Sequence, residues 1–208
     1  ELERIDRIVR SLLDYARPAP LELAPVDVNE AVDTALGLVA SQKEFDGIKW
    51  LKEFSPRCPR AVTDKHLLEQ VLINLLLNAA QATTRAGTIR LGTEAGPARR
   101  WQGGDHRVGR AFASDDEVIV ISIVDQGPGI PPGDLERIFE PFFSTKGYGQ
   151  GSGLGLAICH SLIEALQGAL AIKSQLGSGT TARVFIPAMV ATSALEPASG
   201  PRRGERSP

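Results

Sequence analysis

The stretch that decides the fold runs from Asp125 to Leu156 and reads DQGPGIPPGDLERIFEPFFSTKGYGQGSGLGL. The apolar, β-branched residues 118–124 (VIVISIV) lead into it, and such a run predicts a buried strand. Asp125 would then lie at the end of that strand, beside a turn that contains Gly127 and Gly129. Because glycine lets the backbone approach a ligand closely, this turn predicts a carboxylate at the edge of a binding site.

A second glycine cluster ends the stretch and runs directly into residues 154–166 (LGLAICHSLIEAL), whose apolar spacing predicts a helix. Its unshielded backbone N–H groups and the positive end of the helix dipole together favour an anion. A glycine cluster alone is more often an ordinary turn, but beside the Asp125 carboxylate it predicts a nucleotide site. The cluster consists of Gly149, Gly151, Gly153 and Gly155.

Upstream, residues 65–84 (KHLLEQVLINLLLNAAQATT) have the pattern of a helix that is apolar on most faces and therefore buried. One polar stripe interrupts it, with Gln70, Asn74, Asn78 and Gln81 at positions i, i+4, i+8 and i+11. A buried amide without a partner costs roughly 1–3 kcal/mol, so these amides bond neighbouring loops or helices, or they bind a ligand. Near a phosphate site the second reading is favoured, because an amide oxygen suits Mg²⁺.

Composition excludes several classes. The 208 residues suit one domain with extensions, and 42% of them are apolar. The 23 basic and 25 acidic residues nearly cancel, which argues against a nucleic-acid or anionic-membrane binder. No run approaches the roughly 18 apolar residues of a membrane span, so direct membrane contact is not expected. Cys58 and Cys159 are typical of free thiols in a reducing compartment, which predicts a cytoplasmic location, with the full-length protein soluble or membrane-anchored.

The order of the predicted elements favours an α/β fold, specifically a two-layer α/β sandwich. Helices are expected at 30–40, 65–84 and 154–166, and strands at 48–54, 61–63, 88–94, 118–125, 169–175 and 180–186. Residues 95–117 are long for a hairpin connection and predict a solvated, mobile insertion. Their basic and aromatic side chains also allow a docking patch for an acidic partner; these are Arg99, Arg100, Trp101, His106, Arg107 and Arg110.

Five sequence blocks, in the right order, resemble the catalytic ATP-binding domain of bacterial sensor histidine kinases, within the wider group of Hsp90, MutL and gyrase B ATPases. The FEPFFSTK block and the short segment before GSGLGL are similar to those of nitrogen-regulator-type kinases. The resemblance covers roughly residues 21–187. It implies the Bergerat-type ATP-binding fold. The blocks are EQVLINLLLNAAQA (69–82), DQGPGI (125–130), FEPFFSTK (139–146), GSGLGLAI (151–158) and GSGTTARVFIP (177–187).

The resemblance also implies a site. Asp125 would accept the adenine amino group, a contact that rejects guanine because its oxygen is also an acceptor. Asn78 would be the metal ligand for Mg²⁺, and Phe142 and Phe143 would fold over the nucleotide or anchor a lid that Gly147, Gly149 and Gly151 let move. The implied catalytic residues are Asn74, Asn78 and Lys146. The implied ATP-binding residues are Asn78, Asp125, Gly127, Gly129, Ile130, Phe142, Phe143, Lys146, Gly151, Ser152, Gly153, Leu154, Gly155, Leu156 and Thr180.

The first seventeen residues predict a bundle or coiled-coil helix, because Leu2, Ile5, Val9, Leu12 and Ala16 alternate spacings of three and four. An amphipathic helix folded onto its own domain is the alternative. By resemblance, residues 1–17 end a dimerisation helix, 18–29 form a linker and first strand, 30–190 form the catalytic domain with the insertion at 95–117, and 191–208 form a disordered tail.

None of His66, His106 and His160 has the context of a phosphate acceptor in this family, so the acceptor is expected upstream of Glu1. The implied partners are ATP or ADP, the acceptor helix of the same kinase, and a response-regulator receiver domain, with a homodimer for the full-length protein. A conformational ATPase is the alternative, but such enzymes carry a glutamate where this chain has Asn74. A serine kinase of the anti-sigma type is a third possibility, disfavoured by the N-terminal bundle helix.

Overall fold

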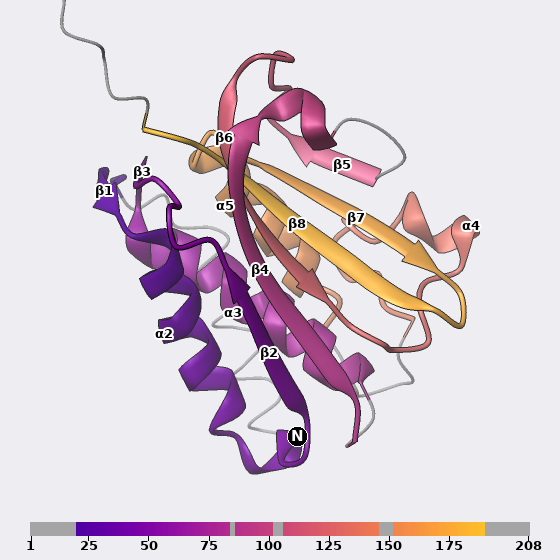
Figure 1. Ribbon diagram of the computed structural model, residues 1–208. Helices are drawn as coiled ribbons and strands as arrows, with labels where there is room; N and C mark the ends of the chain where they lie inside the picture. Colours follow the sequence, from indigo (N-terminus) through magenta and orange to yellow (C-terminus); the bar gives the residue numbers. More distant parts are fainter. Residues whose placement is uncertain (1–19, 84–85, 102–105, 146–151, 190–208) are drawn as a thin grey trace, which may run out of the picture.

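The computed structural model describes residues 20–83, 86–101, 106–145 and 152–189. A six-stranded sheet forms one layer and three helices form the other (Figure 1), which confirms the predicted two-layer α/β sandwich. The helices are α2 (Val28–Ala40), α3 (Lys65–Ala82) and α5 (Gly155–Ala165). The sheet has the order β2 (Lys49–Phe54), β4 (Thr88–Pro97), β6 (Glu117–Val124), β8 (Gly179–Pro187), β7 (Ala169–Gln175) and β5 (His106–Gly109).

Strand β2 runs parallel to β4, and the other neighbours in this sheet pair antiparallel. A separate two-stranded sheet joins β1 (Ala24–Val26) to β3 (Ala61–Thr63). Short helical turns complete the fold: η1 (Lys43–Phe45), η2 (Ala98–Trp101) and α4 (Pro132–Leu135). Among the helices that the structure describes, none is long and apolar enough to span a membrane.

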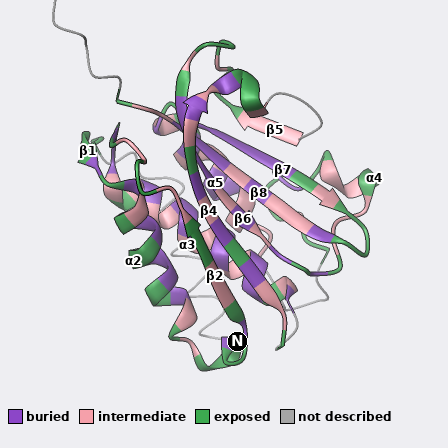
Figure 2. Cartoon of the chain, viewed as in Figure 1, coloured by how far each residue is buried: buried purple, intermediate pink, exposed green. Residues whose placement is uncertain are grey.

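The main core lies between the sheet and the helices, on what we call the inner face of the sheet. Alternate strand residues point into it, as a half-buried sheet requires, and buried positions recur along the strands in Figure 2, separated by less buried ones. On β6 these are Ile119, Ile121 and Ile123. They pack against the apolar residues of α2, α3 and α5, so the helix that carries both asparagines is fixed against the centre of the sheet.

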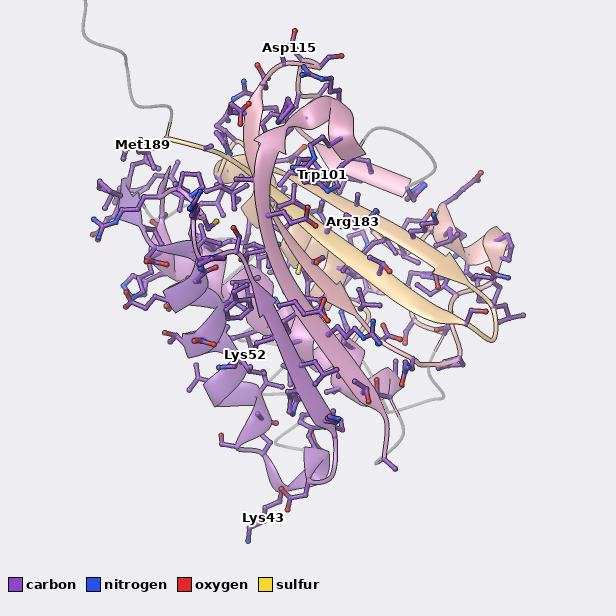
Figure 3. The ribbon with its side chains drawn as sticks, in the orientation of Figure 1. Lys43, Lys52, Trp101, Asp115, Arg183 and Met189 are labelled. Atoms are coloured by element: carbon purple, nitrogen blue, oxygen red, sulfur yellow. The ribbon has the colours of Figure 1, made fainter. Side chains whose placement is uncertain are left out.

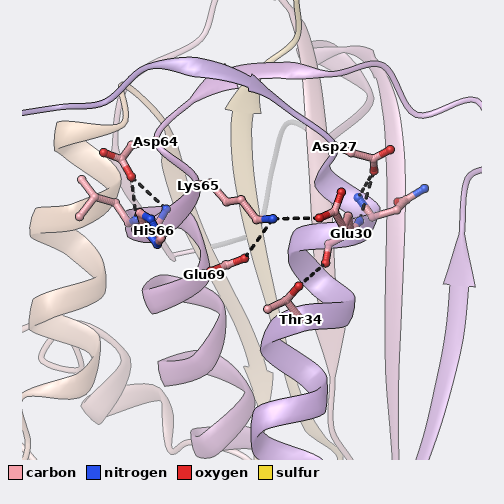
Figure 4. A network of polar contacts seen from close by, with 9 residues as sticks. Asp27, Glu30, Thr34, Asp64, Lys65, His66 and Glu69 are labelled. Carbon is pink, nitrogen blue, oxygen red and sulfur yellow. Dashed lines mark hydrogen bonds and ion pairs between the residues drawn. The ribbon is translucent and has the colours of Figure 1, made fainter.

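Carboxylates fix the starts of two helices (Figure 4). Asp27 caps α2, and Asp64 caps α3 by accepting from the backbone N–H groups of His66 and Leu67. Asp64 also accepts from the N–H of Glu22 at 2.9 Å. Burial acts to raise the pKa of Asp64, but these three backbone hydrogen bonds outweigh it and lower that pKa. The hydrogen bond from Glu22 thus holds the segment before β1 against the start of α3.

Residues 95–117 correct the expectation of a solvated, mobile loop. Residues 95–97 extend β4, Ala98–Trp101 form a helical turn, and His106–Gly109 form the edge strand β5, which pairs with β7. The expectation was wrong for these described parts because HRVG is short and polar, and its pairing partner lies far along the chain. The predicted helix at 1–17 and the tail at 191–208 lie outside the described residues.

We call residues 98–101 and 106–112 the outer-face segment, because Trp101, Arg107 and Phe112 lie on the face of the sheet opposite the helices. Phe185 of β8 is its centre: the ring of Trp101 meets it edge-on at 6.5 Å, and the Arg107 guanidinium lies 4.3 Å from its centroid. Figure 3 labels Trp101 here and Asp115 in the turn before β6. A small second core forms around Phe185, with Ala98, Val118, Val120, Ala169 and Ala171 buried beside it.

Three arginines of this region have carboxylate partners, and a fourth, Arg107, has a backbone carbonyl. Arg99 pairs with Asp115, Arg100 with Glu94 at 3.3 Å, and Arg110 with Asp116 at 3.7 Å. Arg107 donates to the carbonyl oxygen of Trp101 at 2.9 Å. These contacts account for the basic residues within the fold itself, so they do not favour the docking patch for an acidic partner.

Candidate functional site

A cleft of about 1170 Å³ opens between α3, the ends of the central strands and the start of α5. It brings together residues that lie far apart in the sequence, from the asparagine helix and from both ends of the 125–156 stretch. Those of the predicted site that line it are Asn74, Asn78, Asp125, Gly129, Ile130, Phe143, Ser152, Gly153, Gly155, Leu156 and Thr180. Gly127 and Leu154 flank it in sequence, while Lys146 and Gly151, with Gly147 and Gly149, lie outside the described residues.

Asp125 follows the last residue of β6 and is only 7% exposed. Its Oδ1 accepts from the backbone N–H of Gly127 at 2.8 Å and from that of Thr180 at 3.2 Å. Burial raises the pKa of this carboxyl, while the two hydrogen bonds act in the opposite direction. No donor among the described residues reaches Oδ2, so one oxygen is fixed by the fold and the other remains available to a ligand.

The turn after Asp125 is held by the β7–β8 hairpin. Gly129 has a φ of +72°, and a Cβ there would collide with the carbonyl oxygen of Gln175. Pro128 accepts a hydrogen bond from the N–H of Gly177 at 2.7 Å. Glycine is therefore required at 129 for close approach to a second backbone segment, which differs from the expected reason, close approach to a ligand.

The two asparagines have different surroundings on the cleft wall. Asn78 lies beside Gly155, where a Cβ would be 3.7 Å from its Nδ2, and within the described part of the chain its side chain has no hydrogen-bond partner. Asn74 lies near Cys159 of α5. Burial raises the pKa of the Cys159 thiol to about 12, although a hydrogen bond from Asn74 acts in the opposite direction. Asn74 thus joins α3 to α5 at one side of the cleft, and Asn78 lies one helical turn further along the same wall.

The two phenylalanines of FEPFF also separate. Phe143 lines the cleft and carries the Arg137 guanidinium 4.4 Å above its ring. Phe142 is 65% exposed and has a φ of 68°, and its N–H donates to the carbonyl oxygen of Gly153 at 2.9 Å. This backbone contact links the FEPFF segment to the residues just before α5, and both alternatives for Phe142, a cover over the nucleotide and an anchor for a lid, stay predictions.

Sequence reasoning missed Ser174 of β7. Its Oγ accepts from the backbone N–H of Ile130 at 2.8 Å and lies 2.8 Å from the hydroxyl of Thr180. A single serine within a strand gives no sequence signal, because its role depends on a turn more than forty residues away. The contacts of two histidines with Phe139 also have no sequence signal. The ring of His106 stacks on that of Phe139 with 5.8 Å between the centroids, and the ring of His160 lies tilted against the same phenylalanine at 5.9 Å.

The fold and the cleft define a class: a two-layer α/β ATP-binding domain. Residues 63–189 match the family described as "Histidine kinase-, DNA gyrase B-, and HSP90-like ATPase", and the chain belongs to this family.

Individual relatives are similar over most of this chain. It is 34% identical over 187 residues to the sensor histidine kinase ZraS of Salmonella typhimurium (strain LT2). The aligned region covers 90% of this chain and 36% of that protein. Among solved structures, full-length ShkA in complex with AMPPNP has a TM-score of 0.69 at 29% identity, covering 88% of this chain and 35% of that one. Histidine kinase ThkA in complex with the response regulator TrrA has a TM-score of 0.67 at 27% identity, covering 90% and 48%. The chain spans about a third of the length of the curated relatives that it matches first.

Proposed function

We propose that this chain is the catalytic ATP-binding part of a sensor histidine kinase. It binds MgATP and donates the γ-phosphate to a histidine on a dimerisation helix, from which the phosphate passes to an aspartate of a response regulator. Support comes from the similarity to named sensor histidine kinases and to kinase structures with a nucleotide analogue and with a response regulator. A homodimeric full-length protein, with residues 1–17 in the dimer bundle, belongs to the same proposal.

The observation that carries the proposal is the asparagine pair on the cleft wall. Asn78 lines the cleft with an amide that has no partner among the described residues, and Asn74 occupies the position one helical turn earlier, where a hydrolytic ATPase needs a general base. An amide cannot take a proton from water. Of the described residues that line the cleft, only Glu44 and Asp125 carry carboxylates, and the backbone donors of Gly127 and Thr180 fix Asp125. A site that positions phosphates without activating water suits transfer to an external acceptor.

The residues present fit an adenine nucleotide. The available Oδ2 of Asp125 would accept from the exocyclic amino group of adenine, and Thr180 lies beside it on the cleft wall. At the other end, Gly153 and Gly155 would present backbone N–H groups to the phosphates at the start of α5. Ser152 and Leu156 would flank those contacts, Ile130 and Phe143 would pack on the nucleotide, and Lys146 would reach a phosphate.

The residues also fit Mg²⁺, with Asn78 as its protein ligand. Within the described residues no group of three or more His, Cys, Asp or Glu side chains is placed to hold a metal. Mg²⁺ suits such a site, because it is commonly bound by one or two protein oxygens together with substrate phosphates and water. When bound, it would neutralise phosphate charge. The role of Asn78 is to fix where that charge is neutralised.

The proposal is tested with two separate proteins. This chain with MgATP should neither label itself nor release phosphate at an appreciable rate. A purified dimerisation domain that carries its acceptor histidine should then take up label that is acid-labile and alkali-stable, which distinguishes phosphohistidine from phosphoserine. Transfer should be slow, because an untethered pair lacks effective concentration, and it should accelerate when the acceptor domain is fused through residues 1–17.

The same dimerisation domain with its histidine replaced by alanine is the control, and a receiver domain should remove the label from the unchanged domain. Rapid phosphate release by the chain alone, unaffected by adding the acceptor, would assign the cleft to a conformational ATPase instead.

A further inference from the structure

We propose that Ser174 is a positioning residue that decides which nucleotide base the cleft accepts. It does so by fixing the direction of the Thr180 hydroxyl, so that Thr180 faces the cleft only as a hydrogen-bond acceptor. The inference rests on the proposed ATP function and concerns the base end of that site, where Thr180 and Asp125 both line the cleft.

Proton counting at Ser174 carries the argument. Its Oγ has three close partners: the Ile130 backbone N at 2.8 Å, the Gly179 carbonyl oxygen at 3.0 Å and Thr180 Oγ1 at 2.8 Å. A serine hydroxyl has one hydrogen and two acceptor lone pairs. The Ile130 N–H can only donate and the Gly179 carbonyl can only accept, so the single hydrogen of Ser174 goes to Gly179. In its contact with Thr180, Ser174 must therefore accept, and Thr180 must donate.

The direction of this bond reaches the cleft. Since the hydrogen of Thr180 Oγ1 points to Ser174, that oxygen presents only lone pairs to its other neighbours. The nearby carboxylate of Asp125 also presents only lone pairs from Oδ2, because Oδ1 already accepts the N–H groups of Gly127 and Thr180. This end of the cleft therefore offers acceptors alone. A base with an amino group there is matched, and a base with a carbonyl oxygen meets two acceptors, an arrangement that discriminates strongly.

Ser174 also joins the two segments that form this end of the cleft. Its bond to the Ile130 N–H holds the turn after Asp125, and its bonds to Gly179 and Thr180 hold the first residues of β8. One hydroxyl thus fixes both the position of the turn and the polarity of its neighbour.

The experiment compares the binding of ATP and of inosine triphosphate, in which a carbonyl oxygen replaces the amino group, by calorimetry with Mg²⁺. The parent should prefer ATP. Ser174→Ala frees the Thr180 hydrogen to turn toward the cleft as a donor, so the ratio of ATP to inosine triphosphate affinity should fall about tenfold, the effect of one or two hydrogen bonds. In a Thr180→Val background the ratio should already be reduced, and adding Ser174→Ala should change it no further, because no hydroxyl remains to turn.

Ser122→Ala is the matched control. Ser122 lies on the neighbouring part of the same sheet, and its Oγ donates to the Gly92 carbonyl at 3.4 Å, away from the cleft; its removal should leave the ratio unchanged. A thermal melt of each variant sets a temperature at which all are folded.

If Ser174→Ala weakens both nucleotides by the same factor, or still shifts the ratio in the Thr180→Val background, Ser174 is only structural and the inference fails while the proposed function stands. A parent that binds ATP without preferring it to inosine triphosphate would overturn the inference alone, and a parent that binds neither nucleotide would overturn the proposed function.

Discussion

The two faces of the central sheet use polar residues in opposite ways. On the outer face, Arg99 and Arg110 meet carboxylates and Arg107 lies over the ring of Phe185, so each contact is completed within the chain. On the inner face, Asp125 completes the contacts of one oxygen and leaves the other open, and Asn78 has no partner among the described residues.

The difference separates stability from binding. Completed pairs stabilise the fold but offer nothing to a ligand, whereas a polar group held in place with an open lone pair is ready to bind one. Substitutions on the outer face should therefore change the free energy of unfolding, and substitutions on the cleft wall should change nucleotide affinity.

The largest effect is expected at Phe185, which is fully buried under Trp101. Phe185→Ala should lower the free energy of unfolding by about 3–5 kcal/mol, measured by urea denaturation, because it removes the centre of the second core. ATP affinity of the folded protein should change by less than about twofold. Phe142→Ala is the matched control for stability: its ring is 65% exposed, and the free energy of unfolding should change by about 0.5 kcal/mol or less. A large loss of ATP affinity at constant stability in Phe185→Ala would break the comparison.

Asp125→Asn should lower ATP affinity and leave the free energy of unfolding nearly unchanged. It replaces a charge-assisted hydrogen bond worth about 1.5–3 kcal/mol, so ATP affinity measured by calorimetry should fall about ten- to a hundredfold.

The free energy of unfolding of Asp125→Asn should not fall as its ATP affinity does. The reason is that burial raises the pKa of Asp125 above its ordinary 3.8. Protonated Asp125 stabilises the folded state below pH 3.8, and this contribution is lost as the pH rises through the raised pKa. The Asn variant lacks that dependence, so urea denaturation at neutral pH should show no loss of stability from the missing charge. If the ATP affinity of Asp125→Asn were unchanged, the adenine base would have to bind elsewhere than at Asp125.

Asn78→Ala tests the metal site. The variant should bind MgATP about tenfold more weakly, because it lacks a ligand for the metal, yet bind metal-free ATP within about twofold of the parent. Titrations with and without EDTA separate the two, and EDTA should abolish the difference between variant and parent. Equal losses in both conditions would mean that Asn78 supports the wall of the cleft without touching the metal.

The smallest effect is expected for Arg99→Gln. The Arg99–Asp115 pair is exposed on both sides, and such pairs contribute about 0–1 kcal/mol, a difference that urea denaturation would barely resolve. ATP affinity should stay the same, and so should transfer to a receiver domain in the two-protein assay. A severalfold drop in that transfer would revive the outer-face arginines as a docking patch and would end the division of roles between the faces.

Most of the fold follows from local patterns in the sequence. The strand predicted at 169–175 has those bounds, and the helix expected at 65–84 ends at Ala82, because periodic apolar residues identify such elements without knowledge of their partners. Strand β5 could not be found this way. Its four residues alternate weakly, and only the distant β7 makes them a strand.

Part of the site could likewise be predicted from the sequence, and part could not. The motifs placed Asp125, Asn78 and Thr180 on one cleft, since each belongs to a block with a strong pattern. The actual reason for a glycine at 129, its contact with Gln175, and the role of Ser174 depend on how the β7–β8 hairpin meets the turn. Such contacts between separate segments leave no periodic trace in either one.

The pairing of β5 with β7 also sets an order of events when the chain folds. His106 pairs with Ile172 and Gly109 with Ala169, so the outer-face segment is synthesised well before the strand that it needs. Phe185, the centre of its core, is made later still. Contacts this distant along the chain form late, because a long loop must close first. Until β7 and β8 have emerged and paired, Trp101 lacks the strands that it packs against, and the newly made chain exposes apolar surface of the kind that favours aggregation.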